Sequence, residues 1–390
     1  MNSLKDKCAV VGLGWTKFSN NSGVSINSLA VEACKHAIDD AGLTVKDVDG
    51  IATYNIGDSV NPYVVSTTLG IPELKWNIEY FAGANGATST LLAAASAIIS
   101  GLAESILVFR SMNGRSGMRL GGAGQSLNAS GIEQYCVPFG LTTFPQAVAM
   151  VARRHMIKYG TTSRQMGEVA IACRENAILN ERAVMRKPLT MEDYQKSKMI
   201  VDPFRLHDCC QETDGACAVL ITSAEKAKDL KHRPIYLMAG ANGAGGQSGD
   251  FFGKTTAFWP EWEDIADTYA AKMAKDLFGK AGITPKDIDV AELYDCFTIE
   301  PIVQLEDFGF CEKGDGGAFV ESGAIRRDGA LPINTHGGLL SEGYIHGFNH
   351  VLEGVSQLRG DAGERQIKDA EIALVTGYCG PVANAIILRR

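Results

Sequence analysis

Cysteine is the residue in this chain best suited to act as a nucleophile or a metal ligand, and ten are present. None forms a Cys-x-x-Cys pair, and the cluster of Cys209, Cys210 and Cys217 lacks the spacing and partner histidines of a zinc site. The sequence therefore predicts no metal site. Because the N-terminal segment 1–11 has no signal-peptide pattern, the cysteines are expected to be reduced, small buried residues of a cytoplasmic protein.

Two glycine-rich segments partly match the sequence motifs of phosphate-binding loops. The run 249–255 ends in the Gly-Lys-Thr of a P-loop, but the glycine required at the first position is replaced by Ser248. The run 12–14 lacks the rest of a dinucleotide fingerprint. We interpret 249–255 as a flexible loop in which Lys254 is a weak candidate for contact with a phosphate.

Composition and charge narrow the class of protein. A chain of 390 residues is long enough for two domains or for one large layered body. Its hydrophobic fraction of 45% and charged fraction of 21% are ordinary for a soluble globular protein. The net charge of −8 argues against nucleic acid as the main ligand. No apolar run reaches the roughly 18–20 residues needed to cross a bilayer.

The elements that would position a site occur twice. Ala-Gly-Leu-Thr-Val-Lys-Asp-Val-Asp at 41–49 recurs as Ala-Gly-Ile-Thr-Pro-Lys-Asp-Ile-Asp at 281–289, and the unbroken register makes Tyr54 and Tyr294 equivalent. Each copy follows an amphipathic helical run and enters a strand, which predicts two similar α/β halves rather than a solenoid. We place the halves at residues 1–228, with a Gly-rich insertion at about 113–140, and at residues 229–390.

Several motifs in order resemble those of the thiolase superfamily, in its sterol-carrier-protein-2-type branch, often called lipid-transfer proteins. The strand, Gly-rich turn and helix within 80–101 are similar to the segment on which thiolases carry a nucleophilic cysteine. Further matches are 214–219, 295–298, 334–345 and 377–380. The resemblance covers nearly the whole chain. It implies an α/β thiolase fold, in which two similar α/β halves pack as a layered α-β-α-β-α body.

Three thiolase catalytic positions differ in this sequence. The nucleophile is expected within Gly83-Ala84-Asn85-Gly86, where there is no cysteine. The histidine expected before Asp295 is Tyr294, and the histidine expected after Gly343 is Tyr344. This pattern resembles the steroid side-chain aldolases of the branch, which use two tyrosines at these places to cleave a tertiary β-hydroxyacyl-CoA.

The substitutions fit a carbon–carbon lyase. Thiolysis needs a nucleophile that holds the acyl group covalently. A retro-aldol reaction needs only a base for the hydroxyl proton, after which a ketone leaves and the thioester enolate is protonated. Both reactions depend on donors that stabilise the enolate oxygen. The resemblance implies a steroid side-chain CoA ester of the 17-hydroxy C22 type as substrate, and a 17-ketosteroid and propionyl-CoA as products.

We hypothesise roles for single residues. Tyr294 is expected to take the hydroxyl proton and Tyr344 to donate to the carbonyl side or the enolate carbon, although the reverse order stays open. Because tyrosine titrates near ~10, a basic role requires a nearby donor or cation that favours phenolate. Possible supporting residues are Asp295, His346, His350 and the backbone of Gly380, and weaker candidates for substrate or CoA binding are Gly83, Asn85 and Lys254.

Two other functions stay open at this point. One is a β-ketoacyl-CoA thiolase or acyltransferase that uses another cysteine, such as Cys379. The other is a non-catalytic carrier of lipid or acyl-CoA, or a scaffold subunit. The replacement of both histidines by tyrosine favours an enzyme over a degenerate carrier.

The resemblance further implies the partners of the chain. They are a second copy, in a homodimer, and a small protein with an oligosaccharide/oligonucleotide-binding (OB) fold and a zinc ribbon. Zinc is expected only on that protein. No cofactor is expected besides the CoA thioester, which is the substrate.

Overall fold

Nine strands form one twisted sheet that runs through both halves of the chain. The computed structural model describes residues 4–117, 119, 134–244, 264–380 and 382–390. The sheet has the order β3-β2-β4-β7-β1-β8-β11-β10-β9. The strands of the first half are β1 (Cys8–Trp15), β2 (Gly50–Asn55), β3 (Trp76–Phe81), β4 (Ser105–Asn113) and β7 (Asp214–Ser223). Those of the second are β8 (Ile235–Ala244), β9 (Val290–Glu292), β10 (Ile372–Cys379) and β11 (Val382–Arg389).

The two halves repeat the same strand pairing. In the first half β1 is antiparallel to β7, β7 is antiparallel to β4, and β4 is parallel to β2. In the second half β8, β11, β10 and β9 are related in the same way. A short antiparallel pairing of β1 with β8 joins the halves. The predicted architecture of two similar α/β halves is confirmed, while the boundary between residues 228 and 229 stays a prediction.

The recurring motif has a structural reason in the last aspartate of each copy. The carboxylate of Asp49 accepts the backbone N–H groups of Glu104 and Ser105, both at 2.9 Å. The carboxylate of Asp289 accepts those of Glu371 and Ile372 at 2.8 and 2.9 Å. Each aspartate thus fixes the start of one strand to the start of its neighbour, and this explains why the sequence is kept in both copies.

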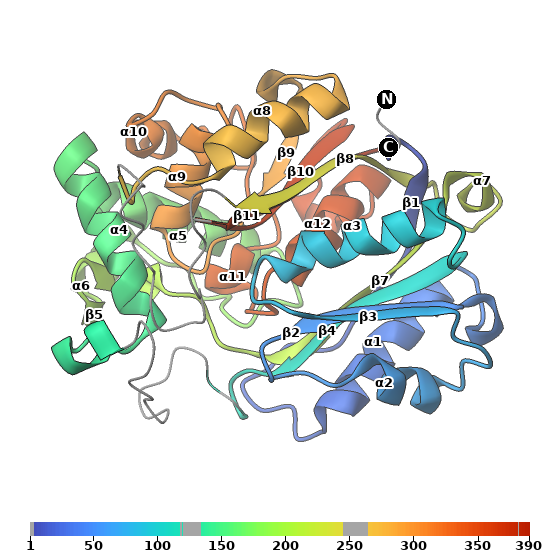
Figure 1. Cartoon of the computed structure of the whole chain (residues 1–390). Coiled ribbons are helices and arrows are strands. Elements are labelled where there is room, and N and C mark those ends of the chain that lie inside the picture. The colour runs from blue at the N-terminus through green and yellow to red at the C-terminus, as the bar shows by residue number, and fades with distance from the viewer. Residues whose placement is uncertain (1–3, 118, 120–133, 245–263, 381) are drawn as a thin grey trace.

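Helices cover the sheet and also fill the space between its halves. In Figure 1, α1 (Ile26–Asp40) and α2 (Pro62–Leu69) lie below the strands of the first half, and α8 (Ala270–Ala281) lies above those of the second. Helices α3 (Gly86–Ile99) and α12 (Phe348–Arg359) lie between them and contact strands of both halves. This is the α-β-α-β-α arrangement predicted from the resemblance.

A side layer of helices flanks this core. It contains α4 (Phe144–Tyr159), α5 (Ser163–Ile178) and α6 (Met191–Lys196), with the hairpin of β5 (Met199–Val201) and β6 (Phe204–Arg205). Shorter helices complete the chain: α7 (Ala224–Ala227), α9 (Ile299–Asp307), α10 (Gly316–Glu321) and α11 (Gly338–Ser341). Among the described residues, no helix combines the length and apolar character that crossing a bilayer requires.

The first turns of α3 and α12 meet in the middle layer. Gly86 must lack a side chain, because a Cβ there would lie 2.2 Å from the ring of Tyr54 on β2. Gly347, which precedes α12 with a φ of 85°, packs so closely that an added Cβ would lie 3.0 Å from the ring of Tyr294 and 3.8 Å from Ala87. These contacts bring Tyr294 to the point where both helices begin.

Candidate active site

Tyr294 and Tyr344 are in direct contact. Their hydroxyl oxygens are 3.0 Å apart, and the two residues are only 1% and 7% exposed. Tyr294 follows β9, and Tyr344 lies between α11 and α12. The two positions that the sequence selected are therefore brought together from segments fifty residues apart.

The backbones of both tyrosines are held by hydrogen bonds. The N–H of Tyr294 donates to the hydroxyl of Thr376 at 2.9 Å, and its carbonyl accepts from the amide of Gln304 at 2.7 Å. The Thr376 hydroxyl donates in turn to the Gln304 side chain at 2.6 Å. The N–H of Tyr344 donates to the carbonyl of Gln211 at 3.0 Å. Such anchoring holds both phenols in one geometry.

Burial keeps both phenols protonated at neutral pH. It raises the pKa of Tyr294 and of Tyr344 well above the usual value for tyrosine, with a smaller contribution from the nearby Cys296. The Arg110 guanidinium lowers the pKa of Tyr344, but less than burial raises it. The surroundings therefore do not favour phenolate, which a tyrosine acting alone as a base would need.

His346 is a buried, neutral imidazole whose tautomer is fixed by Arg110. The Nη2 atom of Arg110 lies 3.0 Å from Nδ1 of His346 and 2.6 Å from the carboxylate of Asp58. A guanidinium can only donate, so Nδ1 accepts and the ring proton is on Nε2. Burial and then the Arg110 charge lower the pKa of His346 to about 3. A donor N–H is thus kept at neutral pH.

The Nε2–H of His346 lies beside the position that lacks a side chain. A Cβ added to Gly83, just before α3, would be 3.5 Å from Nε2. The rings of His346 and Tyr344 are 5.1 Å apart between centroids. One neutral donor and two phenols therefore line the same small region, which suits the binding of an oxyanion and the movement of protons.

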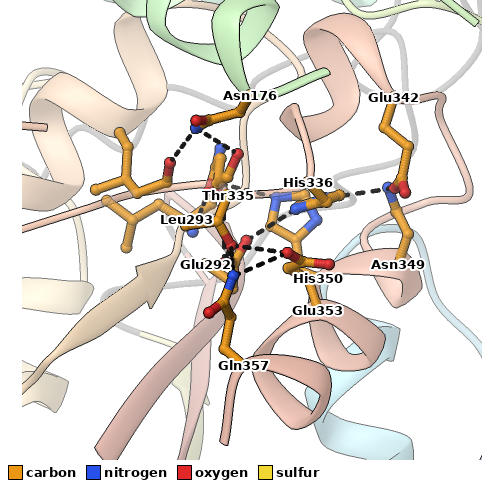
Figure 2. A network of polar contacts seen from close by, with 12 residues as sticks. Asn176, Glu292, Leu293, Thr335, His336, Glu342, Asn349, His350, Glu353 and Gln357 are labelled. Carbon is orange, nitrogen blue, oxygen red and sulfur yellow. Dashed lines mark hydrogen bonds and ion pairs between the residues drawn. The ribbon is translucent and has the colours of Figure 1, made fainter. Parts of the chain in front are cut away.

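Figure 2 shows a buried polar network on the segments that lead to both tyrosines. His336 lies 2.9 Å from Glu292 and 3.5 Å from Glu342, which precede Tyr294 and Tyr344 by two residues each. Burial would lower the pKa of His336, but the two carboxylates raise it to about 9. A cationic imidazole between two glutamates thus connects the segments that hold the phenols.

A second histidine fixes the segment around Tyr294. His350 contacts the carbonyl of Leu293 at 2.9 Å and the carboxylate of Asp295 at 3.1 Å. The same Asp295 oxygen accepts the backbone N–H of Leu339 at 2.8 Å. The side chain of Asp295 is therefore engaged with His350 and the start of α11, in a positioning role.

Comparison with known proteins identifies the family of this chain. Residues 254–389 match the family model described as thiolase C-terminal domain-like. The chain is 41% identical to a 17-hydroxy-3-oxo-4-pregnene-20-carboxyl-CoA lyase from Mycobacterium tuberculosis, over 99% of this chain and 100% of the relative. It is 40% identical to a steroid side-chain-cleaving aldolase from Thermomonospora curvata, over 100% and 99%. The chain belongs to the thiolase superfamily, in its branch of steroid side-chain-cleaving aldolases.

A solved structure extends the likeness to three dimensions. The structure described as "Ltp2-ChsH2(DUF35) aldolase" is 38% identical, with a TM-score of 0.91, over 99% of this chain and 98% of that chain. The thiolase fold predicted from the motifs is thereby confirmed. The neutral N–H of His346 faces Gly83, which lies in the segment where the resemblance to thiolases predicts the nucleophile.

The structure gives less support for a role of the other predicted site residues. The N–H of Gly380 donates to the carbonyl of Val382 at 2.9 Å, so it is already used within its own turn. Asn85 precedes α3, and its carbonyl accepts from Ser89 at 2.7 Å. Lys254 and the side chain of Cys379 lie outside the described residues. Their roles, like the CoA contacts, stay predictions.

Sequence reasoning missed Arg110 and Asp58 and assigned no role to two other side chains. Arg110 could have been noticed, because it is a lone charge in the apolar strand 105–113. His336, to which the sequence assigned no role, contacts two glutamates. Tyr54, selected from the sequence only as the equivalent of Tyr294, is fully buried and donates to the carbonyl of His346 at 2.8 Å.

The His336 network predicts a pH dependence of stability. The pKa of His336 is about 9 in the folded chain and 6.5 in the unfolded reference, so its contribution is complete below about 6.5 and is lost as pH rises through about 9. One pKa unit corresponds to ~1.4 kcal/mol, so the loss is on the order of 3 kcal/mol. When thermal unfolding is measured from pH 6 to pH 10, His336→Gln should be less stable than the wild type at low pH. Its free energy of unfolding should then fall less than that of the wild type as the pH rises.

His232→Gln serves as the control, because this histidine is only half-buried and pairs with Asp40 at the surface. Its stability profile should run parallel to that of the wild type. A profile of His336→Gln that is also parallel to the wild type would show that His336 is not cationic in the fold.

Proposed function

We propose that this chain is a carbon–carbon lyase that cleaves a tertiary β-hydroxyacyl-CoA by a retro-aldol reaction. The proposed substrate is a steroid side-chain CoA ester of the 17-hydroxy C22 type, and the products are a 17-ketosteroid and propionyl-CoA. The 3.0 Å contact of Tyr294 with Tyr344, beside a nucleophile position occupied by Gly83, carries the proposal. The names of relatives that are 40–41% identical over the full chain support the substrate class.

In this proposal, three side chains divide the work. Tyr294 takes the proton of the substrate hydroxyl and in the same step passes its own proton to Tyr344, as the carbon–carbon bond breaks and the ketone leaves. The N–H of His346 binds the thioester oxygen as it becomes an enolate. Tyr344 then protonates the enolate carbon. Because the two phenol oxygens are 3.0 Å apart, a proton can pass between them and return the pair to its starting state.

The thiolase alternative is disfavoured by the thiols near the phenols. A nucleophilic cysteine must be a thiolate, which burial in apolar surroundings opposes. Burial raises the pKa of Cys210 and of Cys296 well above the usual value for cysteine. The carrier alternative does not account for buried, hydrogen-bonded groups such as Arg110 and His346 at the position of the missing nucleophile.

Two partners follow from the proposal. Strand β3 is at one end of the sheet order, and Phe81 at its end is 67% exposed. An open strand edge is a natural place for pairing with another chain, which supports a homodimer through β3. The solved relative is described as an aldolase together with ChsH2(DUF35). We propose that this chain likewise binds a small OB-fold protein with a zinc ribbon.

Removal of either phenol oxygen tests the reaction. Tyr294→Phe and Tyr344→Phe should each lower kcat by about 100-fold or more, because each phenol moves a proton in the reaction. The assay is mass spectrometry of products from a 17-hydroxy steroid side-chain CoA ester, with the chain co-expressed with its small partner. Tyr194→Phe is the matched control, since it removes a buried phenol that donates to Asp208 at 2.7 Å.

The control should retain the wild-type rate, whatever its effect on stability. Near-normal cleavage by both site variants would exclude the assignment of the tyrosines. A substrate fragment trapped on a cysteine during turnover would contradict the lyase itself.

The role of His346 is tested by removing its donor. His346→Phe keeps an aromatic ring but loses the N–H, and it should lower kcat by about 10²–10³-fold with a smaller change in KM, as for other oxyanion donors. His346→Gln, whose amide can still donate, should recover part of the loss. Equal kcat values for the Phe and Gln variants, at equal melting temperatures, would show that the N–H is not used.

The homodimer is tested at the edge of β3. Phe81→Asp should weaken self-association by at least about tenfold, because it puts a charge in the proposed interface. Light scattering after size-exclusion chromatography, over a range of concentrations, measures the change. The control is Tyr63→Asp on α2, which is also exposed, at 56%. A wild-type chain that is monomeric throughout, or a dimer unaffected by Phe81→Asp, would refute pairing through β3.

A further inference from the structure

Glu342 is a fully buried carboxylate two residues before Tyr344, and it is held from two sides. Its Oε1 accepts from Nε of Arg182 at 2.9 Å and from the amide of Asn180 at 2.8 Å. Its Oε2 accepts from the amide of Asn349 on α12 at 2.7 Å (Figure 2). Donors on both oxygens fix the orientation of this carboxylate, and with it the chain that leads to Tyr344.

The loop 180–185, which follows α5, also binds the backbone before Tyr344. Two of its N–H groups donate to the carbonyls of Ser341 and Glu342, at 3.1 and 2.9 Å. The loop therefore holds this stretch through backbone groups as well as through side chains. Because only Gly343 separates the stretch from Tyr344, a change in the loop contacts is passed directly to the phenol.

Arg182 supplies a positive charge to this arrangement. Besides its bond with Glu342, its Nη2 lies 3.3 Å from Glu353, a second fully buried carboxylate on α12. Its guanidinium carbon lies 4.8 Å from the ring centroid of Trp15, which fixes the plane of the group. The side chain of Arg182 is only 11% exposed, so water screens both ion pairs little. Because Arg365 also binds Glu353, at 2.9 Å, the charge of Arg182 matters most for Glu342.

We propose that Arg182 is a positioning residue for Tyr344 in the retro-aldol reaction, and this proposal rests on the proposed function. The guanidinium holds Glu342, and Glu342 holds the segment that carries the Tyr344 hydroxyl 3.0 Å from that of Tyr294. In this proposal Arg182 contacts no reacting atom. It acts on the rate only through the geometry of the two phenols.

Removal of the guanidinium makes the contacts of Glu342 one-sided. Its Oε1 then loses a charged donor, while its Oε2 keeps the amide of Asn349 and lies 3.5 Å from His336. The carboxylate is therefore drawn toward α12, and the backbone that follows it turns with it. Tyr344 moves away from its partner phenol as a result. A misplacement of about 1 Å in a group that acts in the reaction can cost on the order of 100-fold in rate.

The first test does not depend on turnover. Arg182→Met replaces the guanidinium with an uncharged, unbranched side chain that still fills the space beside Trp15. Compared with wild-type crystals, crystals of this variant should show the hydroxyls of Tyr294 and Tyr344 more than about 3.5 Å apart, beyond hydrogen-bonding distance. An unchanged contact of the two hydroxyls in the variant would overturn the proposal, even if the chain is an active lyase.

The second test uses the rate, measured well below the melting temperature of each variant. Arg182→Ala should lower kcat by about 10–100-fold with a smaller change in KM, because the phenols are displaced while the groups that bind the substrate stay in place. Arg182→Lys keeps the charge but not the planar fork, so its kcat should be intermediate. Ethylguanidinium added to Arg182→Ala should raise kcat by about fivefold or more, because a guanidinium can again bind Glu342.

Arg326→Ala is the matched control, because Arg326 also binds two glutamates, Glu168 and Glu175 of α5. It should keep the wild-type kcat, and ethylguanidinium should affect it no more than the wild type. A wild-type kcat in Arg182→Ala, or a loss that neither ethylguanidinium nor the lysine variant reduces, would overturn the proposal. A wild-type chain that cleaves no β-hydroxyacyl-CoA would instead refute the proposed function, and the crystals would still decide whether Arg182 positions the phenol.

Discussion

Two phenol groups are removed from water at the junction of α3 and α12, and most other features of the site are consequences of that burial. A buried hydroxyl needs a partner, and here each phenol contacts the other at 3.0 Å. The same burial raises the pKa of both groups, so neither is charged at neutral pH. Chemistry at this site must therefore move protons between neutral groups, and the arrangement of donors and acceptors around the pair becomes decisive.

Charged side chains lie beside the two phenols, and each is paired with a group of opposite charge. Arg110 is fully buried but pairs with Asp58 at 2.6 Å, and its remaining effect is to keep His346 neutral and fix its tautomer. His336 is cationic but lies between Glu292 and Glu342. Breaking one member of a buried pair leaves an uncompensated charge, so these pairs hold the segments around the tyrosines in place.

The sequence predicted those features of the fold and the site that are visible as repeats or motifs along the chain. It did not predict contacts between residues that are far apart in the sequence. The repeat containing Asp49 and Asp289 predicted two similar halves, because two copies of one sequence can be compared directly along the chain. The pairing of Tyr294 with Tyr344 followed from the resemblance of two motifs. The contact of Arg110 with His346 joins residues 236 positions apart, and no periodicity or spacing could reveal it.

Other features of the site were missed because they, too, depend on contacts between segments that are far apart in the sequence. His336 has no charged residue next to it in the chain, but the fold places two glutamates from different segments around it. The need for a phenolate was argued from the ordinary titration of tyrosine, whereas the extent of burial is a property of the packed structure.

The loss of the nucleophile and the replacement of both histidines belong to one change. A thiol placed at position 83 would face the N–H of His346, which cannot accept its proton, because the lone pair on Nδ1 is held by Arg110. The two phenols nearby are protonated and would not activate it either. A cysteine in these surroundings would have no neighbouring base to take its proton. The same surroundings offer donors to an enolate oxygen, and this difference favours cleavage of a carbon–carbon bond without an acyl-enzyme.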